Sequence, residues 1–141
     1  MKYILYFFIV FLGIPIIYLL YLDSDFYESR RLRGQIANNL NITLSKVPEI
    51  IYRETYGWAE EGGDIALLWL NKQDCKEVSK NMSGEEMSRE TGVFGYYETF
   101  KKKNMQPVSV QTWNARNDHG DFTIYALDRP NCILYRRFHY E

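Results

Sequence analysis

Residues 3–22 form an unbroken stretch of 20 residues without a charged side chain. Only Gly13 and Pro15 interrupt its apolar and aromatic side chains. A helix of this length is about 30 Å long at roughly 1.5 Å per residue, which matches the hydrocarbon core of a bilayer. We therefore expect residues 1–22 to be a transmembrane anchor that holds the chain at a membrane through residues 3–22.

A cleaved signal peptide and a buried core helix are the alternatives for this stretch. Signal peptides have an apolar run of only about 7–15 residues, followed by small residues at the cleavage site. The stretch ends in Leu-Leu-Tyr-Leu-Asp, which offers no small residues, and neither cysteine lies near it. A core helix seldom needs so long a continuous apolar run. These features favour an uncleaved anchor.

The charges on the two sides of the anchor give opposing signals about its orientation. Lys2 and the α-amino group favour an N-terminus in the cytoplasm, whereas Arg30, Arg31 and Arg33 follow the other end and argue the opposite way. A very short tail before the apolar stretch and a long domain after it are typical of a signal anchor. We expect a single-pass protein of the inner or plasma membrane, with its C-terminal domain outside the cytoplasm.

The charge balance bounds what the domain after the anchor binds. Of the 17 basic residues of the chain, all but Lys2 lie after residue 22, which leaves 16 basic and 18 acidic residues in the domain. A nucleic-acid-binding domain would show a basic excess, so we expect no nucleic-acid partner. The remaining length of about 119 residues suits one globular domain.

Hydrophobic periodicity predicts helices early and strands late. Leu32, Ile36 and Leu40 repeat every four residues and predict a membrane-proximal helix within residues 23–45. The continuous apolar run Ile65–Leu70 is typical of a strand buried on both faces. Residues 71–90 hold helix formers, and the later strands are expected within residues 93–100, 107–113, 122–127 and 132–139. We expect residues 46–141 to form an α+β domain with an antiparallel sheet and a few helices on one face.

The chain has two cysteines, Cys75 and Cys132. The only histidines of the chain are His119 and His139, and their spacing from the cysteines is not that of a zinc site. We therefore expect no metal and no cofactor. A disulfide between them would close a loop of about 57 residues and contribute roughly 4 kcal/mol in the chain-entropy model. The alternatives are a disulfide, if the domain lies outside the cytoplasm, and two unrelated buried thiols.

Carboxylates and tryptophans gather around two glycines in the middle of the chain. The segment Glu60-Glu61-Gly62-Gly63-Asp64 could bind a hard cation through oxygen, but it lacks EF-hand spacing, and a solvated hairpin loop is the alternative. Tryptophan is a frequent anchor of protein interfaces, with core packing as the alternative. We expect the binding surface to include Trp58, Glu60, Glu61, Asp64 and Trp113.

His119 is the one histidine set between carboxylates, those of Asp118 and Asp121. Such an arrangement suits a general base. No serine or cysteine nucleophile is paired with it in the sequence, and Asp118–Asp121 is also an ordinary turn. We therefore expect no catalytic residue.

Two segments resemble a known group of proteins. Arg53–Leu70 (RETYGWAEEGGDIALLWL) and residues 121–141 (DFTIYALDRPNCILYRRFHYE) are similar to small uncharacterised bacterial proteins that often have one N-terminal membrane helix. The resemblance implies a Gly- and Asp-rich turn after a polar strand, and a C-terminal hairpin. Those proteins often carry histidines in the first turn, where this chain has Tyr56 and Glu60, so the resemblance implies no metal role here.

These observations predict a membrane-anchored extracytoplasmic domain that binds a protein or an envelope component without catalysis. An immunity or inhibitor protein against an envelope-acting toxin is one concrete form. The alternatives are an accessory subunit of a membrane complex and a small metal- or His-dependent envelope enzyme.

Overall fold

The structure is a computed structural model. It describes residues 13–18, 20–21, 24–58, 61–82, 86–87, 96–116 and 121–140. Most of the expected anchor, residues 3–12, 19 and 22, lies outside the described residues, and those of residues 13–21 that are described are helical. Within the ranges given above, no helix is both long enough and apolar enough to cross a membrane.

The first long helix of the domain is α2 (Asp25–Leu40). It begins after Ser24, whose hydroxyl accepts a hydrogen bond from the Tyr27 amide at 3.3 Å. It ends at Asn41, which has the left-handed conformation common at helix C-termini. The apolar stripe predicted for this helix is buried, which confirms the four-residue period as the face that packs on the sheet.

A six-stranded antiparallel sheet forms the centre of the domain. Its order is β1-β2-β6-β5-β4-β3, so the last three long strands form a meander against the first hairpin. The strands are β1 (Glu49–Trp58), β2 (Glu61–Trp69), β3 (Glu86–Met87), β4 (Val110–Arg116), β5 (Phe122–Asp128) and β6 (Ile133–Tyr140). The predicted α+β class with an antiparallel sheet is confirmed, as is the C-terminal hairpin.

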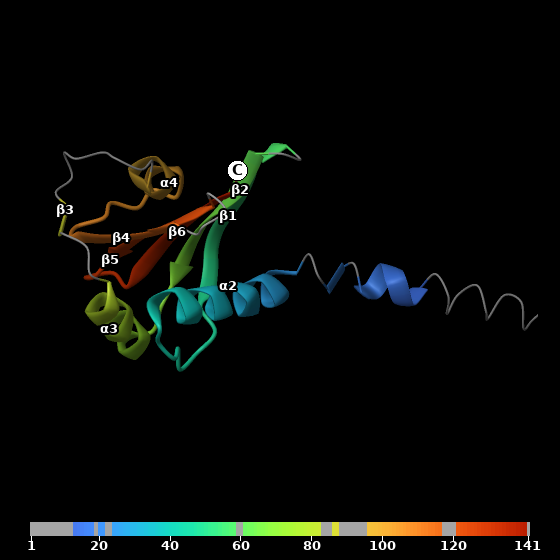
Figure 1. The fold of residues 1–141 in the computed structure, drawn as a ribbon, viewed down its shortest axis with the longest axis horizontal. Coiled ribbons are helices and arrows are strands. Elements are labelled where there is room, and N and C mark those ends of the chain that lie inside the picture. The colour runs from blue at the N-terminus through green and yellow to red at the C-terminus, as the bar shows by residue number, and fades with distance from the viewer. Residues whose placement is uncertain are drawn as a thin grey trace, which may run out of the picture.

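Helices cover both faces of this sheet, and not one face as expected (Figure 1). Helices α2 and α3 (Lys72–Asn81) pack on one face, and α4 (Tyr96–Lys102) packs on the other. The run Ile65–Leu70 explains the second layer, because its alternate residues are apolar on both faces and each face needs a cover. Of the strand predicted at residues 93–100, residues 93–95 lie outside the described residues, and residues 96–100 belong to helix α4, in which Tyr96 and Phe100 lie one helical turn apart and are both buried.

Candidate binding pocket

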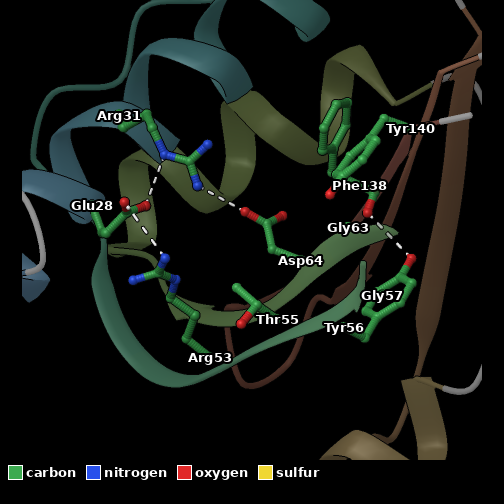
Figure 2. A pocket seen from close by; sticks show the side chains of 10 residues that line it. All are labelled: Glu28, Arg31, Arg53, Thr55, Tyr56, Gly57, Gly63, Asp64, Phe138 and Tyr140. Atoms are coloured by element: carbon green, nitrogen blue, oxygen red, sulfur yellow. Dashed lines mark hydrogen bonds and ion pairs between the residues drawn. The ribbon is translucent and has the colours of Figure 1, made fainter. Parts of the chain in front are cut away.

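A pocket of about 460 Å³ opens between the first half of α2 and the ends of three strands. It lies on the sheet face that α2 covers, at the end where the β1–β2 hairpin turns (Figure 2). Its lining combines charged side chains with aromatic rings: Glu28, Arg31, Arg53, Thr55, Tyr56, Gly57, Gly63, Asp64, Phe138 and Tyr140. A volume of this size is within the range of small-molecule and side-chain pockets.

Alternating charges connect α2 to the sheet across this pocket. Arg31 places its Nε 2.7 Å from Glu28 Oε2 and one Nη 2.7 Å from Asp64 Oδ2. Glu28 also lies 3.5 Å from an Nη of Arg53 on β1. Burial alone would lower the pKa of Arg31, but the hydrogen bonds and charges of Asp64 and Glu28 outweigh it, and the pKa is raised.

Arg136 completes the network beneath the pocket. Its side chain is only 1 % exposed, and one Nη donates to Asp64 Oδ1. Its guanidinium lies 5.3 Å from the centre of the Phe138 ring, which lines the pocket. Because Asp64 also pairs with Arg31, this one carboxylate pairs with two guanidiniums, one at each of its oxygens.

The network has a positive charge and hydrogen-bond donors that are not satisfied within the described part of the chain. It contains three guanidiniums and two carboxylates, so its formal charge is positive. The Nε groups of Arg53 and Arg136 are buried and have no hydrogen-bond partner among the described residues. Buried donors without acceptors are rare in folded proteins. Arg53 lines the pocket whereas Arg136 does not, so the Arg53 Nε is the unpartnered donor with which the pocket could receive an acidic group.

Gly63 allows the strands around the pocket to approach closely. A Cβ at this position would lie 1.9 Å from the Phe138 carbonyl oxygen and 2.8 Å from the Tyr56 hydroxyl. Tyr56 lies opposite Gly63 in the β1–β2 register, and its hydroxyl donates to the Phe138 carbonyl at 3.3 Å and accepts from Arg137 Nε at 3.1 Å. Gly62 and Gly63 belong to the paired strand β2. Because they have no side chain, Tyr56 can pack closely against them.

Of the residues predicted to bind, the structure places Asp64 at the centre of the pocket (Figure 2). Trp58 and Glu61 form the last pair of the β1–β2 hairpin, next to the pocket residue Gly57, and only their backbone is described. Glu60 lies outside the described residues. Trp113 is half-buried on β4, where its ring lies 5.6 Å from that of Tyr125, and it does not line the pocket.

Sequence reasoning missed four charged residues of the network: Glu28, Arg31, Arg53 and Arg136. Arg31 belongs to a run of basic residues that is also typical of a solvated helix face. A signal for Arg136 was present, because it alternates with Leu134 and Phe138 on a strand face that is otherwise apolar. A charged residue on a core-facing position needs a buried partner, and that partner is Asp64.

The remaining candidates lie elsewhere. Cys75 is buried and Cys132 is partly exposed, and both are thiols in this structure. Both Sγ atoms lie 3.7 Å from the Arg129 carbonyl oxygen, so their positions permit a disulfide. The disulfide between them stays a prediction. Asp118 and His119 lie outside the described residues. Within the described part of the chain, no group of three or more His, Cys, Asp or Glu side chains could hold a metal ion.

Comparisons with protein-family models, with curated proteins and with solved structures find no match for this chain.

Proposed function

We propose that the protein is a single-pass, membrane-anchored binding domain without catalytic activity. Its pocket, formed by α2, β1, β2 and β6, would take an acidic side chain of a protein partner. The observation that carries this proposal is the positively charged network, in which the pocket residue Arg53 has a buried Nε donor without a hydrogen-bond partner among the described residues.

The anchor is supported by apolar side chains that pack on nothing in the domain. Ile17 and Leu20 are each 68 % exposed, and Ile14, Ile16 and Tyr18 are more than half exposed. Figure 1 shows their helix projecting away from the sheet and its helices. A helix that is apolar on all sides needs a buried environment, and a bilayer supplies one. The resemblance to bacterial proteins with one membrane helix, proposed from the sequence, agrees with this reading.

The pocket would then face the membrane surface. Glu28 follows the end of the apolar stretch at residue 22 by only six residues and lies in the first turn of α2. A partner with an acidic residue close to its own membrane span would reach the pocket directly. Carboxylate pairing with arginine is among the strongest charge-assisted hydrogen bonds, and its geometry is specific. An immunity or inhibitor protein acting at the envelope is one form of such a binder.

Purification of the full chain from its native membranes in mild detergent tests the proposal. We expect a stoichiometric membrane protein to co-purify, and Arg53→Glu to reduce its recovery by about tenfold or more, the loss that follows from removing a central interface residue. Lys101→Glu, an exposed charge reversal on α4, is the matched control and should leave recovery unchanged. Equal recovery with both variants, each folded by circular dichroism, would contradict the proposal.

A second comparison separates pocket binding from the accessory-subunit alternative. Residues 1–22 are replaced by an unrelated single-pass helix, and the pocket is left intact. Pocket binding predicts that the partner is retained. An accessory subunit whose own helix packs inside a larger membrane complex predicts that the partner is lost. A reporter fused after Glu141 checks orientation, and alkaline phosphatase activity there is expected from an extracytoplasmic domain.

A further inference from the structure

A second cavity, of about 450 Å³, lies away from the pocket, between α3 and the β5–β6 turn. Lys72, Lys76 and Lys80 repeat every four residues along one side of α3 and line it. Arg129 and Pro130 of the turn line its other wall. The cavity therefore has a basic rim, which raises the local concentration of anions.

Both cysteines of the chain line this cavity. Cys75 Sγ and Cys132 Sγ each lie 3.7 Å from the same acceptor, the Arg129 carbonyl oxygen. Cys132 is also close enough to Cys75 to contribute to the raised pKa of the Cys75 thiol. Residues that are 57 positions apart in the chain are thus held as neighbouring thiols at the wall of a basic cavity.

The backbone of Cys132 has an unusual conformation that the surrounding structure holds in place. Among the described residues, three other than glycine have a positive φ: Asn41, Asn104 and Cys132. Asparagine tolerates this conformation well. Cys132 has φ 54°, which is uncommon for a cysteine. The position is fixed by the Leu70 amide, which donates to the Cys132 carbonyl at 2.9 Å. Strained residues concentrate where a side chain is used.

The two thiols differ in reactivity. Burial, together with Cys132 and the Asp128 carboxylate, raises the pKa of Cys75 to about 12. Cys132 is the more exposed of the two thiols, so a disulfide in the cavity reaches its Sγ more readily than that of Cys75. The thiolate is the form that attacks a disulfide. Cys132 is therefore the attacking residue, and Cys75 reacts second.

We propose that Cys75 and Cys132 form an exchangeable dithiol that reduces anionic low-molecular-weight disulfides entering through this basic cavity. The Cys132 thiolate attacks one sulfur of the disulfide, which breaks that S–S bond and expels one thiolate. Cys75 then loses its proton to solvent and attacks Cys132 Sγ, which expels the second thiolate and closes the Cys75–Cys132 bond. The small disulfide gains two electrons and the protein dithiol loses two. This inference is independent of the pocket at the other end of β2.

The full chain, purified in detergent and reduced, is tested with dithiobis(nitrobenzoate), an anionic disulfide whose leaving thiolate is coloured. We expect two leaving groups released per chain and a protein product lighter than the dithiol by two hydrogens. Cys75→Ser should stop at a stable mixed disulfide on Cys132, and Cys132→Ser, which keeps only the Cys75 thiol, should react with the reagent more slowly than Cys75→Ser. Two mixed disulfides per unaltered chain, or a faster reaction of Cys132→Ser than of Cys75→Ser, would overturn the proposal.

Charge selectivity is tested with a neutral dipyridyl disulfide beside the anionic reagent. Lys76→Glu reverses one charge at the rim and should slow the anionic reagent about threefold at moderate ionic strength, with the neutral reagent unaffected. Lys101→Glu on α4 is the control, and neither rate should change. An equal effect of Lys76→Glu on both reagents, or none on either, would show that the cavity does not select anions.

Discussion

Asp64→Asn is the most informative single substitution in the network, because it removes a charge and retains the shape of the side chain. In the native protein, Asp64 faces two guanidiniums of very different burial. The side chain of Arg136 is 1 % exposed, whereas that of Arg31 is 33 % exposed. The substitution therefore leaves the buried Arg136 without its Asp64 counter-charge, whereas the more solvated Arg31 keeps its pair with Glu28.

The buried partner dominates the expected loss of stability. Removing one member of a buried ion pair costs about 3–5 kcal/mol, since the other charge stays buried. A largely solvated pair contributes about 0–1 kcal/mol. The asparagine oxygen can still accept a hydrogen bond from Arg136, which places the loss near the lower value, about 3 kcal/mol. For a domain of this size, that loss lowers the melting temperature by about 12 °C.

Thermal unfolding of the full chain in detergent, followed by circular dichroism, measures this loss. Arg31→Ala is the matched control, because it removes the solvated partner and leaves the buried pair between Asp64 and Arg136 intact. It should lower the melting temperature by no more than about 4 °C. Equal shifts for the two variants would refute the argument that the buried charge carries the cost.

Three further outcomes are expected. Gly63→Ala should destabilise the domain by about 3 kcal/mol or more, because its Cβ would lie 1.9 Å from the Phe138 carbonyl oxygen. Gly34→Ala on α2 is the control, because a Cβ there meets open space, and it should stabilise the domain by about 1 kcal/mol. Melting temperatures measure both effects. Burial opposes ionisation of Asp74, but hydrogen bonds from the Ser45 and Lys46 amides outweigh it and lower the pKa of Asp74 below 3.8. The ionised Asp74 therefore contributes its full stabilisation of the fold above that pH, and this contribution is lost as the pH falls through the lower pKa of the folded state. Asp74→Asn should therefore flatten the acid limb of melting temperature against pH. His119→Ala should leave partner binding unchanged in the pull-down, and loss of the partner from a folded variant would contradict the proposed position of the binding surface.

Local patterns predicted the strands well where they alternate or form apolar runs. The β5–β6 hairpin follows from strict alternation around a short polar turn. The strand predicted at residues 93–100 was wrong for residues 96–100, the part that the structure describes, because an aromatic-rich segment has no clear period over so few residues. The apolar run Ile65–Leu70 already required a cover on both sheet faces, and only one was expected. The second cover is α4, which lies in the segment that was misassigned.

The candidate site was predicted only in part, because its residues come together through tertiary contacts. Asp64 drew attention through its neighbouring glycines and carboxylates. Its partners Arg31 and Arg136 lie 33 and 72 positions away, and no local pattern connects them to it. The signal that the sequence did contain was the position of Arg136 on the core-facing side of an alternating strand. Such a residue predicts a buried carboxylate without saying which one.

Strand β2 separates the two sites, and this separation makes a last prediction. Asp64 lies near its start, and Leu70, which holds Cys132, directly follows its end. Six residues of strand span about 20 Å, well beyond the distance at which substitutions usually couple. The stability losses of Asp64→Asn and Cys75→Ser should therefore add to within about 0.5 kcal/mol in the double variant. Chemical denaturation of the four proteins measures this sum, and a larger deviation would mean that the pocket and the dithiol belong to one coupled site.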